Sequence, residues 1–127
     1  MEALIHLDTH VVAWLYGGEL GRLSNAARDA LDRHDLRISP MVDLELQYLF
    51  EIERITESPS VVLGHLETDI GLKVCDAPFP SVVRLAREQT WTRDPFDRLI
   101  VAQASLRQSP LLTRDSNIQQ HYPRAVW

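Results

Sequence analysis

The order in which apolar runs and helix-start signals follow one another sets the fold class of this chain. Five short apolar runs predict strands, and they alternate with longer amphipathic segments. The predicted strands are residues 3–7, 36–38, 72–75, 111–113 and 125–127, the last of them at a sheet edge. The predicted helices are residues 9–15, 25–34, 40–55, 59–70, 80–88 and 95–107. Strands alternating with helices indicate an α/β fold, with a short, mostly parallel sheet covered by helices on both faces.

Four of the predicted helices begin at a recognisable cap. Ser24 is expected to be the N-cap of the second helix, because serine oxygens accept from the free N–H groups of a first turn. The other three starts pair a cap residue with a proline at the first helical position, namely Ser39-Pro40, Ser58-Pro59 and Asp94-Pro95. The glycine-containing stretch 17–21 predicts a turn.

Length and composition narrow the class of protein. A chain of 127 residues is expected to form a single domain, residues 1–127, with its own core. Cys75 is the only cysteine, which excludes an internal disulfide and favours the cytoplasm. No stretch approaches the ~20 apolar residues of a membrane span. The net charge of -5 argues against binding nucleic acid by overall charge, but a carboxylate site could still act on RNA locally.

Acidic residues follow the predicted strands, where open parallel sheets bind their ligands. Asp8 directly follows the first strand, and Asp115 lies just after strand 111–113. Asp94 and Asp97 open the helix that leads into that strand. Each has a simpler interpretation: Asp8 and Asp94 as helix caps, Asp97 as an acid favoured in a first turn, and Asp115 as a turn residue.

Glu45 is harder to explain by local structure. On a helical wheel it lies within about 60° of five apolar residues, which are Met41, Val42, Tyr48, Leu49 and Ile52. A carboxylate within an apolar stripe is costly unless it is paired or bound to metal. The alternatives are a salt bridge to an arginine or a side chain that faces a functional site.

Together these acids predict a metal centre. Several carboxylates at one site without matching bases repel one another, and divalent cations relieve that repulsion. Sites made of oxygen ligands alone select Mg²⁺ or Mn²⁺. Two such ions ~3.5–4 Å apart can activate water and stabilise a leaving oxygen in phosphodiester cleavage.

Four motifs resemble those of VapC-type PIN domains. They are LDTHVVAWL at 7–15, ISPMVDLE at 38–45, RDPFDRLIVAQA at 93–104 and LLTRD at 111–115. The resemblance implies a three-layer PIN fold and a Mg²⁺- or Mn²⁺-dependent endoribonuclease toxin, blocked by a cognate VapB-like antitoxin. It matches Asp8, Glu45, Asp97 and Asp115 to the acidic quartet of the family, and Asp94 to an additional acid. Val42 is a departure, since many relatives carry a serine or threonine there.

Further expectations concern contacts with RNA and protein. Arg98 and Arg114 each follow a predicted ligand and are expected to hold the RNA backbone, with a solvated or capping charge as the alternative. On the wheel of helix 40–55 the core-facing arc runs from Leu44 through Met41 to Val42. Phe50 then lies on the polar side, and we expect it at the centre of an interface with a second toxin chain, as in a homodimer, or with the antitoxin.

Other functions fit the sequence less well. A receiver domain would place adjacent acids after its first strand and a lysine near a later strand end, whereas Leu7 and Thr9 flank Asp8, and Lys73 begins a strand. The five histidines show no zinc-binding spacing. His10 is either near the site, as in relatives, or a helix-face residue. A catalytically inactive PIN domain that only binds RNA or protein is the remaining alternative, and retention of all four acids argues against it.

Overall fold

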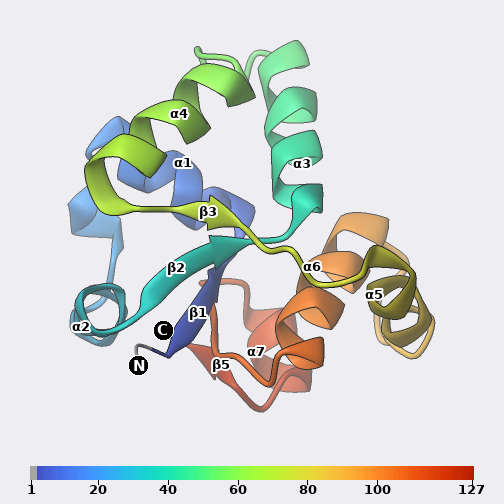
Figure 1. Cartoon of the computed structure of the whole chain (residues 1–127). Coiled ribbons are helices and arrows are strands. Elements are labelled where there is room, and N and C mark those ends of the chain that lie inside the picture. The colour runs from blue at the N-terminus through green and yellow to red at the C-terminus, as the bar shows by residue number, and fades with distance from the viewer. Residues whose placement is uncertain (1–2) are drawn as a thin grey trace.

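The sheet confirms the α/β prediction. A computed structural model describes residues 3–127. The strands are β1 (Leu4–Leu7), β2 (Asp35–Ile38), β3 (Lys73–Val74), β4 (Leu111–Leu112) and β5 (Ala125–Val126). They form one sheet in the order β3-β2-β1-β4-β5, and every pair is parallel. Figure 1 shows the strands surrounded by helices.

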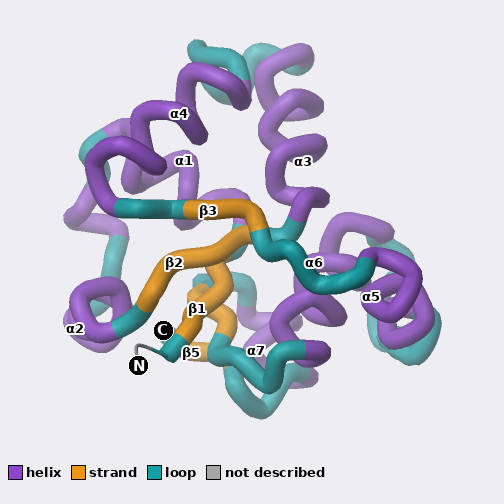
Figure 2. The backbone as a smooth tube through the Cα atoms, in the orientation of Figure 1, coloured by secondary structure: helices purple, strands orange, loops and turns teal. Residues whose placement is uncertain are grey.

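Helices cover the sheet on both faces, as predicted. The helices are α1 (Thr9–Gly17), α2 (Asn25–Arg33), α3 (Pro40–Glu51), α4 (Pro59–Ile70), α5 (Phe79–Ala86), α6 (Pro95–Leu106) and α7 (Ser116–His121), with a 3-10 turn η1 (Leu20–Arg22). Right-handed crossovers place α1, α3 and α4 on one face, and α5, α6 and α7 on the other. In agreement, α1 contacts α3 and α4, and α5 packs on α6 (Figure 2).

The predicted caps begin most of these helices. The Ser24 hydroxyl accepts from the Ala27 N–H at 3.0 Å, and the Ser39 hydroxyl accepts from the Met41 N–H at 3.1 Å. Ser58 occupies the N-cap of α4 without a side-chain hydrogen bond, so Pro59 is the sequence feature that fixes this start. Gly71, which ends α4, has a φ of 71°, the left-handed conformation that favours glycine at a helix C-terminus.

The core lies between the sheet and its helices. The central strand β1 contributes Ile5 and Leu7, and β4 contributes Leu111 and Leu112, all with no exposed surface. The near-continuous apolar character of β4 is typical of a parallel strand that is covered on both faces. This central pair of strands therefore forms a rigid base for the residues that follow β1 and β4.

One helix end and two short elements differ most from the sequence-based prediction. Helix α3 ends at Glu51 rather than near Ile55, because Glu53 has a φ of 61° and the Arg54 N–H turns back to the Leu49 carbonyl at 2.8 Å. No glycine marks this end in the sequence, so the reversal had no local signal. Helix α7, whose N-cap is Asp115, was not predicted, and the 3-10 turn η1 overlaps the stretch that was expected to be a simple turn.

The buried face of α3 was placed wrongly on the wheel. Val42 and Leu46 have no exposed surface, whereas Leu44 and Tyr48, assigned to the core side, are 54% and 51% exposed. Leu44, Tyr48 and Ile52 are spaced four residues apart and form a second apolar stripe, which stays exposed. On the helical wheel this stripe shifted the predicted core-facing side toward Leu44. Glu45 consequently lies at the edge of the buried face rather than in its middle.

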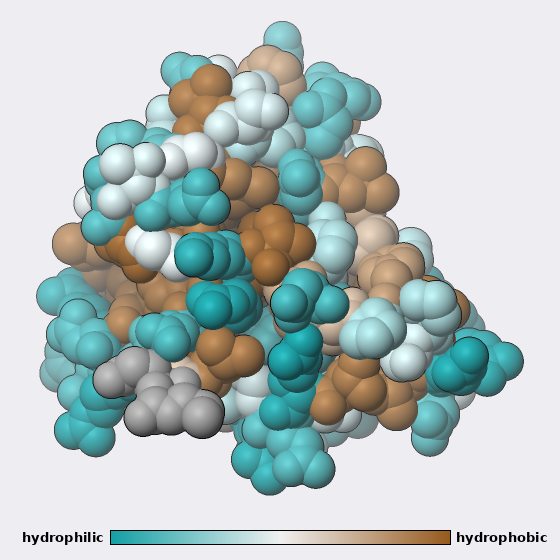
Figure 3. All heavy atoms as spheres, viewed as in Figure 1, coloured by the Kyte–Doolittle hydropathy of each residue, from teal (hydrophilic) through white to brown (hydrophobic). Residues whose placement is uncertain are grey.

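Apolar residues also reach the surface elsewhere. Figure 3 shows apolar patches among polar residues over β3 and α4, where Val61, Ile70 and Val74 are between 42% and 46% exposed. Among residues 3–127, no helix has both the length and the apolar character needed to cross a membrane.

Candidate active site

The acidic residues meet where the direction of the chain connections changes. From β1 the chain moves through α1 and α2 to β2 on one side, while α5 and α6 bring it to β4 on the other side of β1. Such a switch point leaves a crevice beyond the carboxyl ends of the two strands, which is where parallel sheets bind ligands. The Asp8 N–H donates to the Leu112 carbonyl at 3.0 Å, which fixes the first residue after β1 beside β4.

Two hydrogen bonds hold the Asp8 carboxylate. It is 8% exposed and is the N-cap of α1. Its Oδ1 accepts from the Thr9 N–H at 2.8 Å, and its Oδ2 accepts from the Thr113 hydroxyl at 2.6 Å. The Thr113 Oγ1 in turn accepts from the Asp115 N–H at 3.1 Å. One hydroxyl therefore links the acids that follow β1 and β4.

Glu45 enters the site from α3 and is also fixed by a hydroxyl. The buried Thr9 hydroxyl donates to Glu45 Oε1. Glu45 is absent from the ion pairs found among the described residues, so the alternative of a salt bridge to arginine was wrong. Val42, where many relatives have a hydroxyl, is a fully buried core residue here. Thr9, on a different helix, supplies the hydroxyl that orients this glutamate.

Asp94 and Asp97 open α6, and only Asp94 caps it. Asp94 Oδ1 accepts from the Phe96 N–H at 2.8 Å and from the Asp97 N–H at 3.4 Å, which confirms the predicted cap. The hydrogen bonds of the described residues include none to the Asp97 carboxylate. Asp115 has the same capping role for α7, since its Oδ1 accepts from the Asn117 N–H at 2.8 Å and the Ile118 N–H at 3.0 Å. Both caps use Oδ1, which leaves the other carboxylate oxygen for the site.

All five acids line one cavity of about 400 Å³. The remaining wall residues are His10, Val11, Trp14 and Arg114. The structure thus brings together Asp8, Glu45, Asp94, Asp97 and Asp115, which are spread over more than 100 residues of sequence. We call this space the acidic pocket. His10 is exposed and lines it, so the expectation that this histidine is near the site holds.

Three of the carboxylates in this pocket are harder to ionise than usual. Burial raises the pKa of Asp8, and the hydrogen bonds from Thr113 and Thr9 oppose that rise. Burial likewise raises the pKa of Glu45, with a smaller contribution from the charge of Asp8. The pKa of Asp97 rises from 3.8 to about 7, first because of burial and then because Asp94, Asp8, Asp115 and Glu45 all repel its negative charge. The pocket therefore concentrates negative charge that a cation would neutralise.

The residues present fit a divalent cation of the hard type. The acidic ligands offer oxygen alone, with free oxygens on Asp94 and Asp115, and their repulsion is relieved by positive charge. Among residues 3–127, no three acidic, histidine or cysteine side chains already stand in the arrangement of a formed metal site. The fit of the pocket to a divalent cation therefore rests on the oxygen chemistry of its carboxylates and on the cavity that they share.

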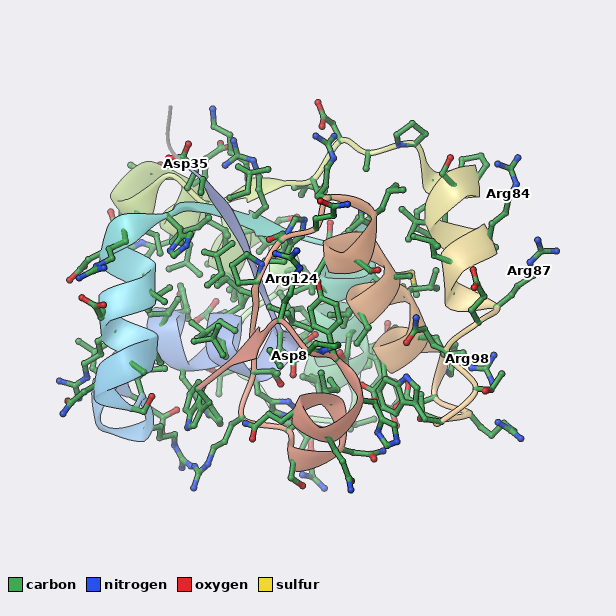
Figure 4. The ribbon with its side chains drawn as sticks, turned by 90° about the horizontal axis from the view of Figure 1, so that it is seen from below. Asp8, Asp35, Arg84, Arg87, Arg98 and Arg124 are labelled. Atoms are coloured by element: carbon green, nitrogen blue, oxygen red, sulfur yellow. The ribbon has the colours of Figure 1, made fainter. Side chains whose placement is uncertain are left out.

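The two arginines predicted to contact RNA are placed differently. Arg114 is exposed and lines the acidic pocket. The Arg98 Nε donates to the Thr92 carbonyl at 2.8 Å, which ties it to the loop before α6. In Figure 4 Arg98 lies well to one side of Asp8, and Arg84 and Arg87 project outward from α5. Only Arg114 of the two predicted residues is therefore next to the acids.

Sequence reasoning missed the two threonines that fix the acids. Thr9 and Thr113 have no exposed surface, yet their hydroxyls face Glu45 and Asp8. The available signal was position: Thr9 directly follows Asp8, and Thr113 stands two residues before Asp115. A hydroxyl at a strand end beside an acid is typical of a residue that orients that acid rather than one exposed to solvent.

Comparison with known proteins points to one domain family. The PIN domain family model matches residues 5–123. The chain is 33% identical over 128 residues to Ribonuclease VapC22 of Mycobacterium tuberculosis, covering 94% of each.

Solved structures share the fold at lower identity. The crystal structure of VapBC2 from Rickettsia felis bound to a DNA fragment from their promoter is similar with a TM-score of 0.66 at 16% identity, over 96% of this chain and 95% of that one. FitAcB from Neisseria gonorrhoeae has a TM-score of 0.51 at 20% identity, over 95% and 94%. The match of the family model over nearly the whole chain, and the relative of the same length, show that the chain belongs to the PIN domain family.

Proposed function

We propose that this chain is a VapC-type toxin, a Mg²⁺- or Mn²⁺-dependent endoribonuclease that cuts RNA phosphodiester bonds and is inhibited by a cognate antitoxin. The observation that carries the proposal is the gathering of five carboxylates around one pocket at the switch point of the sheet. The similarity to Ribonuclease VapC22 supports the reaction, and the VapBC and FitAB neighbours support an antitoxin partner.

Asp8, Glu45, Asp97 and Asp115 would hold the metal, with Asp94 at the rim. When bound, Mg²⁺ or Mn²⁺ supplies an activated water and stabilises the negative charge on the phosphate and the leaving oxygen. The Thr9 N–H and the Thr113 hydroxyl hold the Asp8 carboxylate in position. Because no hydrogen bond from the described residues occupies it, the Asp97 carboxylate is free to ligate or to accept a proton at its Oδ atoms.

Positive and aromatic groups complete the pocket. Arg114 lines the pocket, and we propose that it contacts a phosphate oxygen of the RNA chain, which would compensate locally for the acidic character of the protein. His10 lines the pocket with Asp8 and Glu45, and its charge partly opposes the rise that burial causes in the pKa of both. Arg98, held by the Thr92 carbonyl, would contribute less to RNA binding than Arg114.

The test is cleavage of a single-stranded RNA of mixed sequence by the purified full-length chain. We expect cleavage with Mg²⁺ or Mn²⁺, none in excess chelator, and none by Asp97→Asn with metal present. Asp43→Asn is the matched control, because Asp43 is an exposed acid in the first turn of α3, and it should cut normally. Undiminished cleavage in chelator would contradict the metal site, while RNA binding without cleavage under any condition would favour an inactive PIN domain.

A further inference from the structure

A second cavity, of about 570 Å³, adjoins the acidic pocket. His10 and Trp14 of α1 line both spaces, so the two are neighbours across this helix face. Its floor is apolar and belongs to the core: Leu46 of α3 and Val62 of α4 are 0% and 2% exposed. The cavity is thus preformed by packing of α1 against α3 and α4, and its size is typical of a pocket for a small organic group.

One wall is built for stacking. The Arg22 guanidinium carbon lies 5.6 Å from the centroid of the Trp14 ring, over its face. The Arg22 Nε is held by Glu19 Oε1 at 3.1 Å, which steadies the guanidinium in that place. Tyr16 adds a second aromatic ring to the lining. Unpaired RNA bases are recognised by stacking on aromatic rings and on arginine guanidinium planes.

Another part of the lining offers hydrogen bonds without net charge. It is formed by the connection between α3 and α4, where Arg54, Thr56 and Glu57 line the cavity. Together with Arg22 and Glu19, the cavity holds two guanidinium groups and two carboxylates. This balance suits an uncharged ring with donors and acceptors on its edge, and it contrasts with the acidic pocket, where anions dominate.

We infer that this second cavity, the base cavity, binds the nucleobase of a nucleotide next to the phosphate that is cut. The inference rests on the proposed ribonuclease function. In a continuous RNA strand, a phosphate placed at the acidic pocket brings its neighbouring base beside the shared wall of His10 and Trp14. The base cavity then contributes to the choice of cleavage site, through stacking at Trp14 and Arg22 and edge contacts at Arg54 and Thr56.

The experiment measures the effect of removing one base. The cut position in a single-stranded RNA is mapped first, and kcat/KM is then measured on RNAs with an abasic nucleotide on either side of that phosphate. For wild type we expect one of these two changes to lower kcat/KM about tenfold, equivalent to ~1.4 kcal/mol and within the range of base stacking on protein aromatics. Trp14→Leu and Arg54→Gln should each lower kcat/KM on intact RNA. In these variants, the same abasic nucleotide should cause no further loss of kcat/KM.

Matched controls separate recognition from stability. Trp91→Leu removes another partly buried tryptophan, and Arg87→Gln another exposed arginine; both residues lie outside the walls of the two cavities as described. These controls should keep the full abasic effect. If Trp14→Leu does not fold, Arg54→Gln, on the exposed connection, carries the test alone.

The outcomes distinguish this inference from the function on which it rests. If wild type cuts no RNA with metal, the proposed function fails and the base cavity with it. A second outcome is that wild type cuts RNA and the cavity variants lose as much kcat/KM on abasic RNA as wild type does. Base binding in this cavity would then be refuted, while the ribonuclease function would stand. Cavity variants that alter only inhibition by the antitoxin would likewise refute base binding and identify the cavity as a protein-docking surface.

Discussion

Replacing Asp97 with asparagine should abolish cleavage and yet stabilise the metal-free protein. Asp97 is surrounded by four other carboxylates, and burial and their charges raise its pKa from 3.8 to about 7. A carboxyl group whose pKa is raised on folding costs stability once it must ionise, so this cost grows as the pH rises from about 4 through about 7. Asparagine keeps the shape of the side chain and removes the charge.

The size of the effect follows from the pKa. At ~1.36 kcal/mol per pKa unit, the shift of Asp97 corresponds to a gross cost of about 4 kcal/mol at neutral pH. The side chain is only partly buried, and solvent screens part of the repulsion, so we discount this to ~2 kcal/mol. With a urea m-value of ~2 kcal/mol/M for a small protein, the unfolding midpoint of Asp97→Asn should be about 1 M higher.

The assay is urea unfolding of both proteins in chelator at several pH values between 4 and 8. The difference between variant and wild type should be small near pH 4 and reach its full size above pH 7. Asp43→Asn, which changes an exposed first-turn acid, should stay within ~0.5 kcal/mol of wild type throughout.

Added metal should then make wild type the more stable of the two proteins. Wild type should gain ~2.7 kcal/mol when Mg²⁺ is present at 100 times its dissociation constant, and Asp97→Asn much less. Equal gains in the two proteins would show that Asp97 is not a ligand. A variant no more stable than wild type in chelator at pH 8 would refute the argument from charge repulsion itself.

Four further changes test other contacts. Thr113→Val removes the hydroxyl that holds Asp8 and should reduce activity ~10–100-fold, whereas Thr113→Ser should restore it. His6 is buried, and burial lowers its pKa to about 4. Protonation of this imidazole should therefore reduce the free energy of unfolding by ~3 kcal/mol as the pH falls from 6.5 to 4. Urea unfolding of Asp97→Asn, which lacks the titration of Asp97, measures this loss. Arg114→Gln should lower the salt dependence of RNA binding by about one charge; an unchanged slope would place no phosphate at this residue. Phe50→Ala, at a side chain 37% exposed, should weaken self-association or antitoxin binding by ~2 kcal/mol, seen by sedimentation and calorimetry, without unfolding the chain.

The sequence by itself determined the fold class and the identity of the acids. Alternating periodicity, serine or aspartate caps and first-turn prolines are local signals, and they correctly predicted the parallel sheet and most helix starts. Because ligands bind beyond the carboxyl ends of parallel strands, the sequence alone places Asp8 and Asp115 at the same edge of the sheet.

Only the tertiary structure decided how those acids are held and which faces are covered. Thr9 reaches Glu45 across 36 positions of sequence, and Thr113 reaches Asp8 across 105. No local periodicity encodes such pairings, because they depend on how α1, α3 and β4 pack around one point. The same is true of α3, because its sequence contains two apolar stripes and either could be the buried face. Packing against α1 and α4 buries Leu46 and leaves Leu44 exposed to solvent.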